Sequence, residues 1–320
     1  MRRLQPLYWA AYRIRIQSVG HAMIANWRPA TVESAASEVC LLNGPGFLMV
    51  ERYRRGKGKR RMLGNHQKSW IWGRNLVLET LRAGNWLPMD LLLSEELATD
   101  VRSEAEQLAH DQDIPFERVE PARIRQLCGT SEHQGFAAKM PEFPYANVHD
   151  LAAIVQENDP VMLLICDRIQ DPFNLGAMLR SADGFGVSAV IIPDSEQVGV
   201  TSLVARTSAG AVNHVPIVQC ESLTDVGEQL RDLGVSILAC SEKAESNIGL
   251  CDLTRSVALV VGNEGKGVSR ALLDLADSHV RIPLQGAVSS LNAAVAAAVV
   301  MYEVQRQQRS VASDSGGDVG

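Results

Sequence analysis

The sequence lacks the features that mark metal proteins, membrane proteins and secreted proteins. Its six cysteines form no C-x-x-C pair and have no histidines at metal-ligand spacing, so no metal site is predicted. No stretch approaches the roughly 20 apolar residues of a membrane-spanning helix. Arg13 and Arg15 interrupt the apolar residues near the start, which argues against a secretory signal. We therefore expect a cytoplasmic protein with reduced cysteines, no metal and no membrane contact.

The glycine-rich segment Gly262-Asn-Glu-Gly-Lys-Gly267 also lacks the spacing of the common nucleotide-binding motifs. Its glycines run G-x-x-G-x-G, not the G-x-G-x-x-G of dinucleotide-binding folds, and Val268 stands where a P-loop needs lysine. Glu264 would repel a phosphate. A loop of backbone groups with one carboxylate suits the uncharged adenosine and the cationic sulfonium of S-adenosylmethionine better. The alternative is a tight turn between a strand and a helix.

The net charge of −6 is unevenly distributed along the 320 residues. Residues 1–68 carry 13 Lys/Arg against three Glu, whereas the remaining residues carry 18 Lys/Arg against 34 Asp/Glu. The first segment is interpreted as a basic, disordered extension, or as sequence upstream of a true start at Met62. The alternative is a basic arm that contacts RNA phosphates. An acidic remainder means that any RNA affinity must come from local basic patches.

Residues 160–308 alternate between short apolar, β-branched runs and helical patterns, which predicts a parallel sheet covered by helices. The expected strands are Val161–Cys166, Ala189–Ile192, His214–Val218, Val235–Ala239, Val257–Val261 and Val280–Ile282. The expected helices are Leu175–Phe185, Thr201–Ala211, Leu223–Leu233, Ser269–Leu275 and Leu291–Gln307.

Residues 69–140 are expected to form a smaller α/β domain of their own. Helices are predicted at Asn75–Ala83, Glu95–His110 and Pro121–Cys128, and strands at Met89–Leu93, Ile114–Val119 and Gln134–Lys139. Residues 141–159 are interpreted as a linker with a short helix, and residues 309–320 as a disordered tail.

Three polar blocks follow strands of the larger domain. They are Asp167-Arg-Ile-Gln-Asp-Pro-Phe-Asn-Leu-Gly-Ala-Met-Leu-Arg180, the glycine-rich segment at 262–267, and Ser289-Ser-Leu-Asn292. Because ligands of open α/β sheets bind at the carboxyl edge of the strands, we expect the blocks to meet there. Asn174 and Ser290 are each predicted to cap a helix. Arg180 lies in an apolar stretch, where a charge needs a partner or a ligand.

The three blocks in this order resemble those of the SpoU (TrmH-like) class of RNA ribose 2′-O-methyltransferases. The resemblance covers about residues 69–307. It implies an α/β, SPOUT-type parallel sheet with a C-terminal trefoil knot, preceded by a small α/β substrate-binding domain that resembles ribosomal protein L30e. The pieces Ile71-Trp-Gly-Arg-Asn-Leu-Val-Leu-Glu-Thr-Leu81 and His133-Gln-Gly-Phe136 carry the second part of the likeness.

The resemblance also implies site residues, a cofactor and partners. The catalytic positions are Asn174, Arg180, Glu264, Ser290 and Asn292. The positions that match the family's backbone contacts to S-adenosylmethionine are Gly262, Ile282 and Leu291. The class forms homodimers with active sites near the subunit interface, for which the helix at 291–307 is a candidate, although its apolar positions could equally belong to the intrachain core.

The likeness is nearest to enzymes that methylate a guanosine ribose in 23S ribosomal RNA, and this is the predicted function. A tRNA ribose methyltransferase is the alternative within the class, and an idle RNA-binding assembly protein is a rival outside it. The five polar residues together argue against an idle scaffold. A nucleotide-dependent dehydrogenase is excluded, because the glycines lack the G-x-G-x-x-G spacing of a dinucleotide-binding fold. Whether Arg180 acts as a general base or as an electrostatic stabiliser is left open by the sequence.

Overall fold

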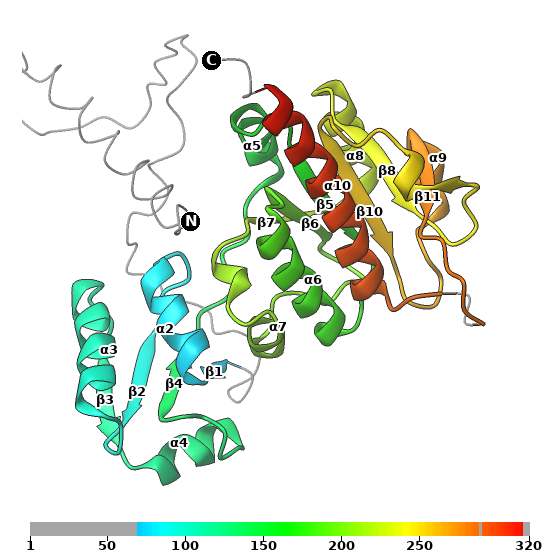
Figure 1. The fold of residues 1–320 in the computed structure, drawn as a ribbon. Helices are drawn as coiled ribbons and strands as arrows, with labels where there is room; N and C mark the ends of the chain where they lie inside the picture. Colours follow the sequence, from blue (N-terminus) through cyan, green and yellow to red (C-terminus); the bar gives the residue numbers. More distant parts are fainter. Residues whose placement is uncertain (1–68, 288–289, 316–320) are drawn as a thin grey trace, which may run out of the picture. The chain divides into compact units, whose positions relative to one another are not determined.

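The computed structural model describes residues 69–287 and 290–315, which form two sheets with their covering helices (Figure 1). The basic extension predicted at residues 1–68 lies outside the described residues, as do the last five residues of the predicted tail. No helix in the described part is long and apolar enough to cross a membrane.

The first sheet belongs to the smaller domain and has the strand order β1-β4-β2-β3. Strand β4 pairs antiparallel with β1 and β2, and β2 pairs parallel with β3. Fully buried side chains, among them Ile71, Leu91 and Phe136, form its core. The elements are β1 (Trp70–Trp72), α2 (Arg74–Ala83), β2 (Asp90–Ser94), α3 (Thr99–Asp111), β3 (Phe116–Val119), α4 (Pro121–Cys128) and β4 (Phe136–Lys139).

Helix α3 begins at Thr99, and the predicted start at Glu95 was wrong. The chain makes a turn first, in which the Leu97 N–H donates to the Ser94 carbonyl at 3.2 Å and the Glu96 N–H donates to Ser94 Oγ at 3.2 Å. Local side-chain bonding of this kind competes with helix formation. The predicted linker does contain the short helix α5 (Leu151–Glu157), which follows the 3₁₀ turn η2 (Val148–Asp150).

The second sheet has seven strands in the order β7-β6-β5-β10-β8-β11-β9, and every pair is parallel. The parallel sheet predicted from the alternation is therefore confirmed. Its strands are β5 (Met162–Asp167), β6 (Ala189–Pro193), β7 (Ile217–Cys220), β8 (Ser236–Cys240), β9 (Ser246–Asn247), β10 (Val257–Gly262) and β11 (Ser278–Arg281). The helices are α6 (Pro172–Phe185), α7 (Ser202–Thr207), α8 (Leu223–Asp232), α9 (Arg270–Leu275) and α10 (Ala293–Ser315), with the 3₁₀ turns η3 (Ala211–Asn213) and η4 (Ile248–Leu250).

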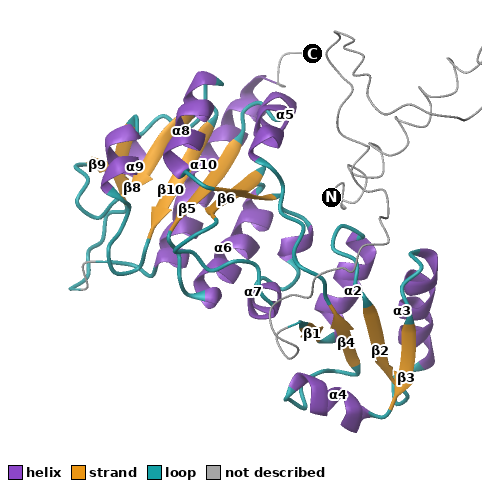
Figure 2. Ribbon diagram, turned by 180° about the vertical axis from the view of Figure 1, so that it is seen from behind, coloured by secondary structure: helices purple, strands orange, loops and turns teal. Residues whose placement is uncertain are grey.

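Successive side chains of the central strands enter two different cores. Leu164 and Leu259 pack with α6 and α10, whereas Ile165 and Val260 pack with α8 and α9. Side chains alternate between the faces of a strand, so a strand covered on both faces is a continuous apolar run. Figure 1 shows α6 and α10 in front of the sheet, and Figure 2 shows the opposite face with α8 and α9.

Several boundaries in the larger domain differ from those predicted. Helix α7 ends at Thr207 and the turn η3 follows, so β7 begins at Ile217 rather than at His214. Helix α10 continues to Ser315, and the disordered tail predicted from residue 309 was wrong for its first residues. Ser310 Oγ donates to the Arg306 carbonyl at 2.9 Å, one helical turn back, which satisfies this hydroxyl within the helix.

Candidate active site

The first block runs from the end of β5 into α6, and its cap is Asp171 rather than Asn174. The Asp171 carboxylate accepts from the Phe173 N–H at 2.9 Å, and Pro172 occupies the first helical position. Aspartate before proline is a strong helix start because proline has no N–H group that would need an acceptor there. Asn174 is thereby placed inside the first turn, where only 8% of it is exposed, and its amide is free to bond elsewhere.

The second block begins where β10 ends, directly beside the first. Gly262 pairs with Asp167 in the ladder between β10 and β5. A Cβ atom on Gly262 would lie 2.1 Å from the backbone N of Val268 and 2.2 Å from the carbonyl carbon of Gly267. Only glycine lets the chain fold back this closely. We call residues 262–267 the glycine loop.

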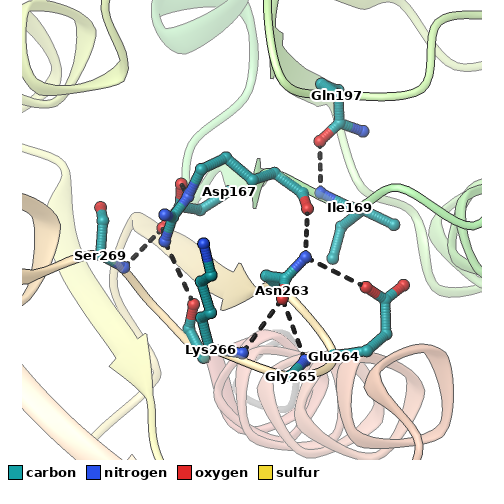
Figure 3. Close-up of polar contacts among 10 residues, drawn as sticks. Asp167, Ile169, Gln197, Asn263, Glu264, Gly265, Lys266 and Ser269 are labelled. Atoms are coloured by element: carbon teal, nitrogen blue, oxygen red, sulfur yellow. Dashed lines mark hydrogen bonds and ion pairs between the residues drawn. The ribbon is translucent and has the colours of Figure 1, made fainter.

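The glycine loop is closed by its own hydrogen bonds. The Gly267 N–H donates to the Asn263 carbonyl at 2.8 Å. The Asn263 side-chain oxygen accepts from the Gly265 and Lys266 N–H groups at 3.0 Å each, as Figure 3 shows. These bonds give the loop one defined shape and present the Glu264 side chain toward α6.

Side chains of all three blocks meet in one hydrogen-bonded chain, which we call the Asn174 cluster: Asn174, Glu264 and Asn292. Asn174 Nδ2 donates to Glu264 Oε1 at 2.7 Å, and Asn292 Nδ2 donates to Asn174 Oδ1 at 2.9 Å. These residues are 90 and 118 positions apart in the sequence. The convergence expected at the sheet edge is present for these three positions.

Hydrogen-bonding capacity fixes the orientation of both amides in the cluster. A carboxylate only accepts, so the Asn174 amide must turn its NH₂ to Glu264 and its oxygen to Asn292. Asn292 must then donate with its own NH₂, which leaves its oxygen for the N–H groups of Ala294 and Val295 at 2.9 and 3.3 Å. Asn292 is thus the cap of α10.

Ser290 is not that cap, contrary to the prediction. It precedes the helix by three residues and is exposed, and no hydrogen bond or ion pair described in the structure joins it to the Asn174 cluster. Of the predicted cofactor contacts, Gly262 lies in the loop just described, and Ile282 is half-buried against the core of the α6 and α10 face. Leu291 is 37% exposed beside Asn292.

Arg180 is exposed on α6, so the argument that it needs a partner was wrong. Arg180 lies six positions after Asn174 in the helix, which turns its side chain about 120° away around the axis. The apolar neighbours Met178 and Leu179 face the core while Arg180 faces solvent. Among the residues that the structure describes, Arg180 has no ion pair or hydrogen bond, and its guanidinium is available to a ligand.

Asp167, Arg168 and Asn263 join the first two blocks, although no role was predicted for them from the sequence. Asp167 is 3% exposed and pairs with Arg168 through its two oxygens, at 2.9 Å to Nε and 3.3 Å to Nη2. This pairing raises the pKa of Arg168 above its ordinary value. The signal was present in the sequence, because an aspartate directly after an apolar strand is buried with that strand and needs a partner.

Within residues 69–287 and 290–315, no group of three or more histidine, cysteine, aspartate or glutamate side chains could hold a metal ion. Burial raises the pKa of the Cys166 and Cys240 thiols to about 12, which keeps both protonated at neutral pH.

Known protein families match the chain in two successive segments. Residues 70–146 match the RNA 2′-O ribose methyltransferase substrate-binding family, and residues 161–302 match the SpoU rRNA methylase family. YacO of Bacillus subtilis (strain 168), assigned to the TrmH family of tRNA/rRNA methyltransferases, is 33% identical over 248 residues, covering 77% of this chain and 99% of YacO. The chain belongs to the SpoU methylase family. The family predicted from the three blocks is confirmed. The predicted enzyme class, an RNA 2′-O-ribose methyltransferase, is confirmed as well.

Other members of the SpoU family and their solved structures agree with this assignment. A tRNA/rRNA methyltransferase of Mycolicibacterium vanbaalenii is 36% identical over 264 residues, covering 80% of this chain and 83% of the relative. The SpoU methyltransferase AviRb from Streptomyces viridochromogenes, solved with S-adenosylmethionine, has a TM-score of 0.64 at 26% identity, covering 75% of this chain and 90% of AviRb.

A crystal structure of an RNA 2′-O ribose methyltransferase has a TM-score of 0.60 at 28% identity, covering 76% of this chain and 90% of the other. These likenesses confirm the SPOUT-type α/β fold. The trefoil knot stays a prediction.

Proposed function

We propose that this SpoU-family enzyme methylates the ribose 2′-hydroxyl of a guanosine in 23S ribosomal RNA, with S-adenosylmethionine as methyl donor. The Asn174 cluster carries the proposal, because it joins three distant blocks at the carboxyl edge of the sheet, where α/β proteins bind ligands. The match of residues 70–146 to a substrate-binding family supports an RNA target, and the match of residues 161–302 to the SpoU rRNA methylase family supports ribosomal RNA.

The described residues fit S-adenosylmethionine, which when bound supplies a methyl group on a cationic sulfonium. Glu264 keeps accepting capacity, since one oxygen is held by Asn174 at 2.7 Å while the other has the Asn263 amide only at 3.5 Å. A carboxylate near a sulfonium is favourable, and near a polyphosphate it is not. Gly262, Ile282 and Leu291 would provide backbone contacts.

The difficult part of the reaction is the nucleophile, because a ribose hydroxyl is hardly ionised at neutral pH. Arg180 is exposed and has no partner among the described residues, so its guanidinium can bind the RNA. A guanidinium keeps its proton at neutral pH. Arg180 therefore acts in this proposal by holding the adjacent phosphate and stabilising charge that develops on the sugar oxygen. Asn174, Glu264, Ser290 and Asn292 orient the reactants.

The proposed assembly is a homodimer formed through α10. Val295, Val299 and Tyr302 are 49%, 38% and 53% exposed and lie at helical spacing on one face of α10. Helix α10 packs on α6, which carries Arg180 and the exposed Phe173. A second subunit on this face would cover the apolar side chains next to the candidate site.

Methyl transfer to defined RNAs tests the proposal. The purified enzyme is incubated with radiolabelled S-adenosylmethionine and either a transcript of the peptidyl-transferase region of 23S RNA or total tRNA, and ribose methylation is mapped in each. Transfer to one guanosine ribose of the ribosomal transcript is the expected result. Transfer to tRNA alone would favour the tRNA alternative. Cofactor binding without transfer to either RNA would contradict both targets, and no cofactor binding would indicate the idle RNA-binding protein.

A further inference from the structure

Arg168 holds a backbone conformation that residues with side chains rarely adopt. Its φ is +60°, in the left-handed region, at the point where β5 has ended and the chain turns toward α6. Strained residues persist where the surrounding contacts determine their conformation, and they gather at functional sites. The contacts of Arg168 therefore indicate what this conformation serves.

The backbone and the side chain of Arg168 hold opposite ends of the glycine loop. Its carbonyl accepts from Asn263 Nδ2 at 2.9 Å, at the start of the loop. Its Nη2 donates to the Gly267 carbonyl at 3.4 Å, at the end of the loop. The same guanidinium is oriented by both oxygens of Asp167.

Asp167 is in turn fixed by the chain that leaves the loop. Its Oδ2 accepts from the Ser269 N–H at 2.6 Å, and Figure 3 shows this contact beside those of Asn263. A buried carboxylate needs both its ion pair and its hydrogen bonds, so Asp167 constrains Arg168 strongly. The described contacts make one unit of Asp167, Arg168, Asn263, Gly267 and Ser269, which we call the Arg168 latch.

The Arg168 latch determines where Glu264 lies. Asn263 is the residue next to Glu264, and its amide is shared between the Arg168 carbonyl and the two N–H groups inside the loop. A shift of the loop would move Glu264 away from Asn174, to which it is bound at 2.7 Å. Arg168 itself touches neither Asn174 nor Asn292 in the described structure, so its influence on them passes through the loop.

We propose that Arg168 is a positioning residue that holds the glycine loop in the shape in which Glu264 meets Asn174 and the methyl donor. This inference rests on the proposed function. The competing explanation is that the latch merely stabilises the edge of the sheet, in which case its loss would lower stability without a separate effect on the loop or the cofactor.

Two substitutions separate these explanations, each with a matched control. Arg168→Gly removes the guanidinium and suits the left-handed backbone. Its control, Ala209→Gly, relieves a φ of +53° at an exposed methyl side chain. Arg168→Lys keeps the charge but loses the bidentate geometry. Its control, Arg118→Lys, makes the same change at the two-bond pair with Glu106, at 2.7 and 2.9 Å in the smaller domain.

Three measurements are made on the full-length protein: hydrogen exchange at the Gly265 and Lys266 amides without cofactor, the dissociation constant of S-adenosylmethionine by calorimetry, and the unfolding midpoint. Well below its unfolding midpoint, Arg168→Gly should speed exchange at both amides more than at amides of the sheet core, and should weaken cofactor binding roughly ten-fold to a hundred-fold. The midpoint should also fall, because the buried Asp167 carboxylate loses its ion pair. Arg168→Lys should recover part of the affinity. Both controls should behave as wild type in exchange and in binding.

Unchanged exchange and affinity in Arg168→Gly would overturn the positioning proposal and leave the proposed function intact. Exchange that speeds equally at the loop amides and at amides of the sheet core would also overturn it, in favour of the purely structural explanation. Wild-type protein that does not bind S-adenosylmethionine would overturn the proposed function and this inference together. The exchange measurement needs no cofactor, so it still reports whether Arg168 orders the loop.

Discussion

Glu264 is the residue whose charge, rather than its shape, should matter for the methyl donor. Replacing it by glutamine keeps an oxygen that can accept from Asn174 and leaves the size unchanged. We expect Glu264→Gln to bind S-adenosylmethionine about ten-fold more weakly, because a carboxylate near the sulfonium is lost. S-adenosylhomocysteine has a neutral sulfur and should bind the variant and the wild type alike. Calorimetry with both ligands checks this, and an equal loss for both would contradict an electrostatic role.

Arg180 offers a complementary test, because it is exposed and unpaired in the described structure. Arg180→Lys keeps the positive charge but cannot contact two oxygens of a phosphate in a plane. Single-turnover methyl transfer should fall roughly ten-fold to a hundred-fold, with unchanged cofactor affinity and unfolding midpoint. Near-normal transfer by the lysine variant would count against the proposed role. The same change at exposed Arg309, near the far end of α10, is the control.

At single positions, the polar side chains near the site could be identified from the sequence. Which of them are buried and which of them cap a helix could not. Asn174 has the side chain of a helix cap, but Asp171 followed by Pro172 starts the helix first and leaves the Asn174 amide to Glu264. Arg180 looked buried because of its apolar neighbours, yet the helical turn points them inward and the guanidinium outward. The latch around Arg168 depends on a left-handed backbone, which no residue pattern specifies at an arginine.

At the scale of elements, long apolar strands could be located because burial on both faces makes them continuous runs. The short strands β1 and β9 were missed, since three and two residues are too few to show a periodicity. Their pairing depends on neighbours far along the chain, namely β4 and β11. The start of α10 was placed near Leu291, but the cap that sets it is Asn292, which also belongs to the candidate site.

Asn292 has two roles, capping α10 and donating to Asn174, and substitutions can separate them. Asn292→Ala removes the oxygen that caps α10 and the amide that reaches Asn174, so it should cost about 1 kcal/mol of stability and impair methyl transfer. Asn292→Ser keeps a capping oxygen but has no group long enough to replace the amide. The serine variant should keep most of the stability and lose transfer as the alanine variant does. Urea unfolding and single-turnover assays measure the two effects, and a serine variant with full activity would show that only the cap matters.

At the scale of the whole molecule, α10 links the candidate site to the proposed second subunit. Asn292 at its first turn bonds to Asn174, and its body packs on α6, which carries Arg180. A subunit bound to the exposed face of α10 would therefore contact the helix that positions Asn292 and packs on α6. The sequence alone could not distinguish this face from intrachain core, because Val295 and Val300 are alike in type and differ only in exposure.

The dimer can be tested at Val299, which is 38% exposed in the middle of α10. Val299→Glu introduces a better helix former at the position but places a charge on the apolar face, where an unpaired buried charge is costly. We expect sedimentation equilibrium to give the mass of a dimer for the wild type and of a monomer for the variant. The variant should also lose most of its methyl transfer. Leu250→Glu is the control, since Leu250 is 86% exposed in the turn η4 and lies outside this face. A monomeric wild type, or a monomeric Val299→Glu protein with full activity, would show that the site is complete within one subunit.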